Sequence, residues 1–189
     1  RDRYSTQIPH RIRDKLSYLL NLPKNSIRVI APDVGGAFGA KLNLYPDEYV
    51  TCLASIKLGR PVKFIESRRE HMISSTHGRG MIAEAKMALS REGTIKGYKL
   101  KVIGDLGAYL LDTTPWIPII TIKMATGPYK IKNLLAEAYG VYTNLPPTGA
   151  YRGAGRPEAT YILERMMDRA ANLLDMDKAE IRKRNFIPI

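Results

Sequence analysis

Apolar residues recur at the spacing of an amphipathic helix in several parts of the chain. The clearest case follows Pro157, where apolar positions from Leu163 to Leu174 keep the i, i+3, i+4 spacing of one helix face. A similar pattern begins at Pro9, a residue suited to a first helical turn. Another stops at Gly59, which suits the position just after a helix. The first predicted helix begins at Pro9 and is ended by Pro23 and Asn25, and two more cover 47–58 and 157–174. A helical turn is expected at 69–73, and a short last helix would be capped by Asp177 and Glu180.

Alternation of apolar and polar positions predicts strands between these helices. The alternation is clearest over 79–89 and 94–105, and Gly93 in the intervening turn allows the two segments to form an antiparallel hairpin. Residues 105–130 are expected to be irregular because prolines interrupt them. Further strands are predicted over 2–7, 26–31, 62–66 and 134–143. The pattern favours an α/β fold of the α+β type, with a mixed sheet, a β-hairpin and packed helices.

Length and composition narrow the class of protein. The 189 residues, 44% hydrophobic and 25% charged, fit one medium domain or two tightly packed small subdomains, and we expect a single domain over 1–189. No apolar run approaches the roughly 20 residues that span a bilayer, and no signal peptide is visible. The only cysteine, Cys52, is expected in the core and allows no disulfide or cysteine-built metal site. A cytoplasmic location is the simplest expectation.

The net charge of +12 is compatible with nucleic acid, an acidic partner subunit or an anionic cofactor. Lysine and arginine are spread along the chain, and no basic stripe is interleaved with aromatic residues. Ordinary solvated surface is therefore favoured over a nucleic-acid-binding face. A nucleic-acid binder is supported by charge alone.

A first glycine-rich loop follows the predicted strand 26–31. Gly35, Gly36 and Gly39 let the backbone take positive φ and approach a ligand closely, and successive N–H groups in such a loop form an anion-binding concavity. The loop is not a P-loop, because Lys41 is followed by Leu42 rather than by Ser or Thr. Taken alone, a tight structural turn is slightly favoured over a ligand site.

A second glycine-rich loop, 149–155, leads into the helix that begins at Pro157. The helix N-terminus offers free N–H groups and a positive dipole, which suit an oxyanion or phosphate. Arg152 and Arg156 add charge-assisted donors. A structural loop with surface arginines is the alternative interpretation, but two such loops in one short chain are harder to dismiss together than singly.

The other polar residues give weaker signals. Gln7 would by default be a solvated or capping amide, and His71 and His77 are assigned to the surface. No histidine lies in a metal-ligand pair such as HExxH. The carboxylates that were considered and show no acid–base pairing are Glu66, Glu70, Asp105 and Asp112.

Four motifs occur together in an order and spacing typical of one family. The chain resembles the molybdenum-binding large subunit of the xanthine dehydrogenase, aldehyde oxidase and carbon monoxide dehydrogenase family, and the similarity covers essentially the whole chain. The motifs are Thr6-Gln7, Val34-Gly35-Gly36-Ala37-Phe38-Gly39-Ala40-Lys41, Ala150-Tyr151-Arg152-Gly153-Ala154-Gly155-Arg156-Pro157-Glu158 and Lys183-Arg184-Asn185-Phe186.

The resemblance implies a molybdopterin cofactor with molybdenum, in the cytosine dinucleotide form common in prokaryotes. It implies hydroxylation of a C–H bond with oxygen derived from water, with electrons leaving through 2Fe-2S clusters and FAD on other chains. Gln7 would hydrogen-bond an oxo ligand, and no residue of this chain would bind the metal directly. The implied cofactor-binding residues are Gln7, Gly35, Gly36, Phe38, Gly39, Ala150, Arg152 and Gly153.

Departures from the family pattern bear on the substrate. Purine-oxidising members carry Glu where this chain has Leu42, and their substrate-binding Arg would fall near Ile120, so a polar clamp is missing. Carbon monoxide oxidisers place Cys where this chain has Gly153, so no thiolate is present at that position and copper–molybdenum chemistry is not expected. An aldehyde or N-heterocycle is therefore expected, with apolar pocket walls from Phe38, Leu42, Trp116 and Ile120.

The family's general base, a Glu in a Val-Gly-x-Gly-Glu type motif, has no counterpart in this chain. We therefore expect no catalytic residue here, and no turnover by this chain alone. The resemblance implies that the chain is the first molybdopterin-binding half of a larger subunit, and that its partners are the remaining half, an iron–sulfur small subunit and an FAD medium subunit. The alternative is a cofactor-free accessory or interaction module of the same fold.

Overall fold

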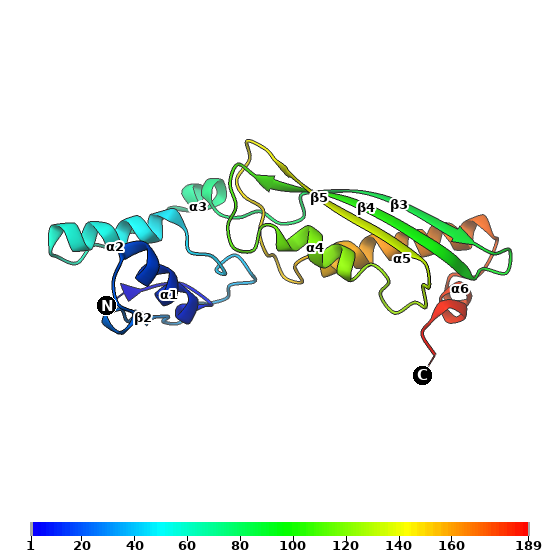
Figure 1. Ribbon diagram of the computed structural model, residues 1–189, viewed down its shortest axis with the longest axis horizontal. Helices are drawn as coiled ribbons and strands as arrows, with labels where there is room; N and C mark the ends of the chain where they lie inside the picture. The colour runs from blue at the N-terminus through cyan, green and yellow to red at the C-terminus, as the bar shows by residue number, and fades with distance from the viewer. Residues whose placement is uncertain (1, 189) are drawn as a thin grey trace.

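The computed structural model describes residues 2–188, and it is an elongated molecule with two lobes (Figure 1). We call residues 2–58 the amino-terminal lobe and residues 81–188 the sheet lobe. Each lobe has its own cluster of buried apolar side chains. The mixture of helices, a mixed sheet and a hairpin confirms the predicted α/β fold of the α+β type.

The amino-terminal lobe is a small βαβ unit followed by a helix. Strands β1 (Asp2–Arg3) and β2 (Val29–Ile30) pair in parallel, and helix α1 (Pro9–Leu20) connects them with a short 3₁₀ turn η1 (Lys24–Ser26). Helix α2 (Pro46–Leu58) ends at Gly59 in the left-handed conformation, as the sequence predicts. The buried side chains of this lobe are Tyr4, Ile12, Leu16, Ile27, Leu44 and Cys52.

The sheet lobe is built on three strands in the order β3-β4-β5. Strands β3 (Met81–Leu89) and β4 (Ile95–Gly107) form the predicted antiparallel hairpin, and β5 (Leu134–Tyr142) pairs with β4 in parallel. Helices α4 (Trp116–Lys123) and α5 (Arg156–Leu173) lie along this sheet, and α6 (Lys178–Asn185) lies at its far end, packed on α5 (Figure 1). Helix α3 (Arg68–Ser74) lies between the lobes and matches the helical turn expected at 69–73. No helix within residues 2–188 is long and apolar enough to cross a membrane.

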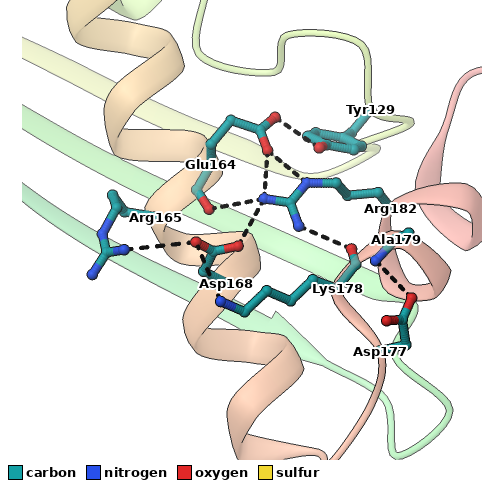
Figure 2. Close-up of polar contacts among 8 residues, drawn as sticks. All are labelled: Tyr129, Glu164, Arg165, Asp168, Asp177, Lys178, Ala179 and Arg182. Atoms are coloured by element: carbon teal, nitrogen blue, oxygen red, sulfur yellow. Dashed lines mark hydrogen bonds and ion pairs between the residues drawn. The ribbon is translucent and has the colours of Figure 1, made fainter.

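A polar network joins α5 to α6 (Figure 2). The Arg182 guanidinium donates to Glu164 at 2.8 Å and to Asp168 at 2.9 Å, and the Tyr129 hydroxyl donates to the other oxygen of Glu164 at 2.7 Å. The hydrogen bond from Arg182 lowers the pKa of Asp168. Because one guanidinium bonds carboxylates on successive turns of α5, it fixes the angle at which α6 crosses that helix.

We expect Arg182→Ala to lower the free energy of unfolding by about 2 kcal/mol, because hydrogen bonds from a charged, partly buried donor are lost. Arg165→Ala is the control: Arg165 is exposed and makes one ion pair with Asp168 at 3.6 Å, so its removal should cost less than about 0.5 kcal/mol. Urea unfolding at pH 7 measures both. Because the pKa of Asp168 is lowered in the folded protein, its contribution to the free energy of unfolding is fully present above the pKa of the unfolded state. That contribution is lost as the pH falls through the pKa of the folded state. Two results would contradict a stabilising role for the Arg182 hydrogen bonds. One is an equal loss of unfolding free energy in the two variants, and the other is a loss in Arg182→Ala that does not become smaller in acid.

Three predicted strands are shorter than expected or absent. The strand expected over 2–7 is limited to β1, and that over 26–31 to β2, with a 3₁₀ turn before it. The strand expected over 62–66 is wrong: the segment makes no strand pairing within residues 2–188, although Phe64 and Ile65 are exposed and apolar. A strand requires a neighbour for its backbone N–H and C=O groups, and composition cannot reveal whether one is present.

The expectation that 105–130 is irregular is also wrong. Strand β4 continues to Gly107, and Trp116–Lys123 forms α4. Pro118 does not interrupt this helix, because it lies in the first turn, where a missing N–H removes no intrahelical bond. Whether this region forms a helix therefore depends on where the proline lies in it, and not on its presence alone.

Candidate functional site

The two glycine-rich loops meet where the amino-terminal lobe joins the sheet lobe. The backbone N–H of Arg152 donates to the carbonyl oxygen of Phe38 at 2.8 Å. Gly39 lies so close to Ala150 that an added Cβ would overlap its carbonyl group, with the carbonyl carbon 2.7 Å away. Two loops more than a hundred residues apart in sequence are therefore in direct backbone contact.

Gln7 is bonded to the first glycine loop on both its main chain and its side chain. Its backbone N–H donates to Lys41 at 3.3 Å, and its side-chain Oε1 accepts from the Gly39 N–H at 3.2 Å. Because the amide oxygen is occupied by an N–H donor, the orientation of the amide is set and Nε2 is left as a donor. Nε2 has no hydrogen-bond partner within residues 2–188.

Successive backbone N–H groups of the first loop are available to a ligand. Among residues 2–188 we find no hydrogen-bond acceptor for the N–H groups of 35–38. Gly35, Gly36 and Phe38 all have positive φ, at 69°, 122° and 52°. Nothing lies within 4 Å of a Cβ built on Gly35, whereas one on Gly36 would meet the Phe38 ring at 2.7 Å. The loop thus carries successive N–H groups without a partner, the kind of segment that can form an anion-binding concavity.

The second loop uses some of its donors internally. The Ala150 N–H donates to the Thr113 hydroxyl at 3.2 Å, and the Arg152 N–H is occupied by Phe38. The Gly153 N–H has no acceptor in the described part of the chain. The resemblance implies one role, cofactor binding, for Ala150, Arg152 and Gly153. In the structure Gly153 has a free N–H donor, whereas Ala150 and Arg152 contact the first loop.

The four apolar residues expected to line a substrate pocket lie in two segments, the first glycine loop and helix α4. The Phe38 side chain is 60% exposed on the first loop, and Leu42 closes a turn by donating its N–H to Gly39 at 3.1 Å. Trp116, which is 52% exposed, begins α4, and Ile120 lies one turn later. Helix α4 packs against the end of the second loop, since a Cβ on Gly155 would be 3.0 Å from that of Ile120.

Sequence reasoning missed the segment 76–80, which lies beside the second loop. His77 forms a parallel bridge with Thr148, donating its N–H to Pro147 at 3.2 Å and accepting from Gly149 at 2.9 Å. Two glycines flank Arg79, and this Gly-Arg-Gly string was the available signal. It was read as the start of a strand.

The carboxylates that the sequence left without an acid–base role have structural partners. Those contacts join Glu66 to His71, Glu70 to Ser67, Asp105 to Thr143 and Asp112 to Lys15. Near the first loop, burial, together with the charges of Asp47 and Glu66, raises the pKa of Glu48 to about 7. Glu48 borders a cavity of about 420 Å³ between α2 and α3. Residues 2–188 contain no group of three or more His, Cys, Asp or Glu side chains placed to hold a metal ion.

The comparisons with known proteins converge on one family. A family model described as the molybdopterin cofactor-binding domain matches residues 3–186. The carbon monoxide dehydrogenase large chain of Hydrogenophaga pseudoflava is 39% identical over 186 residues, which are 97% of this chain and 23% of that protein. The 6-hydroxypseudooxynicotine dehydrogenase complex subunit gamma of Paenarthrobacter nicotinovorans is 37% identical over 94% of this chain and 22% of its own length.

Solved structures agree with the sequence relatives. The crystal structure of quinoline 2-oxidoreductase from Pseudomonas putida 86 matches with a TM-score of 0.93 and 35% identity, over 98% of this chain and 24% of that one. The chain therefore spans about a quarter of the length of each of these three proteins.

Proposed function

Because the chain belongs to the family of molybdopterin cofactor-binding domains, we propose that it holds one side of a molybdopterin cofactor, as a single domain and the first cofactor-binding half of a molybdenum hydroxylase subunit. The relatives named above are oxidoreductases by name, and one is a subunit of a complex. The proposed reaction is hydroxylation of an aldehyde or N-heterocycle with oxygen derived from water. The cofactor, when bound, supplies the two-electron redox chemistry.

The contact between the two loops is the observation that carries this proposal. The unpaired N–H groups of 35–38 and of Gly153 suit the oxyanions and polar edges of a pterin cofactor. The free Nε2 of Gln7 suits an oxo ligand, and the exposed Phe38 ring covers one side of the loop. Ala150 and Arg152 hold the loops in register through backbone contacts with Gly39 and Phe38. The residues present thus fit the group, because both loops offer unpaired N–H donors for its oxyanions and polar edges.

The finer parts of the proposal follow from the resemblance. They are the cytosine dinucleotide form of the cofactor, 2Fe-2S and FAD on partner chains, a general base supplied by the remaining half of the subunit, and a cytoplasmic location. Apolar Phe38, Leu42, Trp116 and Ile120 would exclude water from the substrate and leave purines without a polar clamp.

Elemental analysis of the protein purified from its native source tests the proposal. We expect molybdenum together with co-purifying chains that contain iron–sulfur clusters and FAD. Absence of metal and of partners would instead support the cofactor-free module. Substrate-dependent dye reduction by this chain alone would contradict the proposal that the base lies elsewhere.

Gln7→Glu tests the role of the free amide donor. The variant keeps an acceptor for the Gly39 N–H but replaces the Nε2 donor with a charged oxygen. In the assembled enzyme we expect turnover to fall about 100-fold, the cost of removing one preorganised donor from a site of developing charge. Stability should change by less than about 0.5 kcal/mol because the side chain is exposed. Ser5→Ala, an exposed change two residues away, is the control, and unchanged turnover in Gln7→Glu would exclude this role.

A further inference from the structure

Arg79 contacts the second glycine loop at two residues and the helix that follows it at a third. Its Nη1 donates to Glu158 Oε1 and its Nη2 to the Arg152 carbonyl oxygen, each at 2.8 Å, and its guanidinium carbon lies 4.9 Å from the centre of the Tyr151 ring. Glu158 is in the first turn of α5. One side chain from outside the loop therefore connects the middle of the loop to the helix that follows it.

The environment of Arg79 indicates a built arrangement rather than a surface contact. The Glu158 side chain is only 8% exposed, and its second oxygen has no partner within residues 2–188. Arg79 itself has φ of +69°, a conformation that is costly for a residue with a Cβ. Gly78 fits against Tyr151, where an added Cβ would be 2.8 Å from that of the tyrosine. Buried charge and a strained backbone both require compensating contacts.

The contact with Arg152 determines where the next backbone donor points. The carbonyl group of Arg152 and the N–H of Gly153 belong to one planar trans peptide, so they point in opposite directions. Arg79 holds that carbonyl, and Phe38 holds the N–H of the preceding peptide. Both peptide planes that flank Arg152 are thus fixed, and the free N–H of Gly153 is directed away from Arg79.

We propose that Arg79 is a positioning residue for the cofactor, which aims the Gly153 N–H by holding the Arg152 carbonyl and is itself anchored by the buried carboxylate of Glu158. This inference rests on the proposed function, in which the second loop contacts the cofactor. Arg79 does not touch the cofactor; it acts through the loop.

The test uses the molybdenum-containing protein in its native assembly, with Arg79→Lys, Arg79→Ala and Arg79→Ala combined with Glu158→Gln. Lysine can pair with Glu158 but has no planar fork to reach the Arg152 carbonyl at the same time. The double variant removes the buried carboxylate charge that Arg79→Ala would leave unpaired. Arg169→Ala, an exposed position on α5, is the matched control.

Three quantities are measured for each variant: the unfolding midpoint, the molybdenum and pterin retained after extended dialysis, and the g-values of the Mo(V) signal. We expect Arg79→Lys and the double variant to unfold near the wild type yet to retain about tenfold less cofactor, the usual cost of removing an outer-shell partner. We also expect altered g-values of the Mo(V) signal in the fraction that stays loaded. A purely structural role predicts that retention recovers whenever stability recovers.

Full retention in Arg79→Lys and in the double variant would overturn the positioning role while leaving the proposed function intact. Loss of retention in Arg169→Ala to the same extent would also overturn it. Absence of molybdenum from the wild-type protein would instead refute the proposed function, and the role of Arg79 with it.

Discussion

Gly39→Ala should lower the free energy of unfolding by about 4 kcal/mol and abolish retention of molybdenum. Gly39 has φ of +104°, which costs an L-residue about 1–2 kcal/mol. Its new Cβ would also overlap the carbonyl group of Ala150, and forcing apart a close contact costs about 1–3 kcal/mol more. The added methyl group would thus break the contact between the two loops on which the proposed site depends.

Gly35→Ala is the matched control for this change. Gly35 also has positive φ, at 69°, but nothing lies within 4 Å of its added Cβ. Gly35→Ala should therefore lower the free energy of unfolding only by the cost of a positive φ, about 1–2 kcal/mol. Urea unfolding of both variants isolates the contact between loops as the difference. If Gly39→Ala cost no more than Gly35→Ala, the loops would not be held together as described.

Asn185→Asp should be the most damaging small change in the sheet lobe, at about 4 kcal/mol. Asn185 is 3% exposed; its Nδ2 donates to the carbonyl oxygens of Gly93 and Ile181, and its Oδ1 accepts from the Ile95 N–H, each at 2.8 Å. Aspartate keeps the acceptor but turns an oxygen toward two carbonyl oxygens and buries a charge. Asn185 is on α6 and bonds both ends of the β3–β4 turn, so loss of its hydrogen bonds would separate that turn from α6.

The pH dependence separates this effect from simple loss of packing. Burial beside two carbonyl oxygens disfavours the charged carboxylate, so the introduced aspartate should have a raised pKa in the folded state. The penalty is then largest at neutral pH and shrinks as the pH falls and the carboxyl group takes up a proton. Denaturation of Asn185→Asp and of the exposed control Asn144→Asp from pH 4 to pH 8 measures this. A penalty that does not depend on pH would argue against a buried carboxylate.

Much of the helical structure follows from local pattern. The structure confirms the helices that begin at Pro9 and Pro157 and the hairpin predicted over 79–89 and 94–105, because apolar spacing, first-turn prolines and the turn glycine all agree. Asn185 and Phe186 were identified only as part of a family motif. The structure gives the physical reason for them: Asn185 bonds the hairpin, and Phe186 stacks on Tyr129 with ring centres 5.5 Å apart.

In the candidate site too, local sequence shows some features, and others depend on residues far apart in the chain. Glycine clusters mark the two loops in sequence, but their contact depends on how the lobes meet, which no local pattern encodes. Arg79 was overlooked for the same reason, because its role comes from Glu158, a residue far along the chain. The segment 62–66 has the composition of a strand but forms none, because strand formation depends on a neighbour outside the segment.

The two lobes meet mainly through loops, and within residues 2–188 no helix or strand of the amino-terminal lobe packs extensively on one of the sheet lobe. A ligand that contacts both glycine loops is therefore held by two separately packed bodies at once, and it also links them. Its binding free energy then depends on how the lobes are placed, because only an arrangement in which both loops reach the ligand gives the full set of contacts. Substitutions at the contact between the lobes would therefore change the affinity without touching the ligand, because they change how often that arrangement is populated.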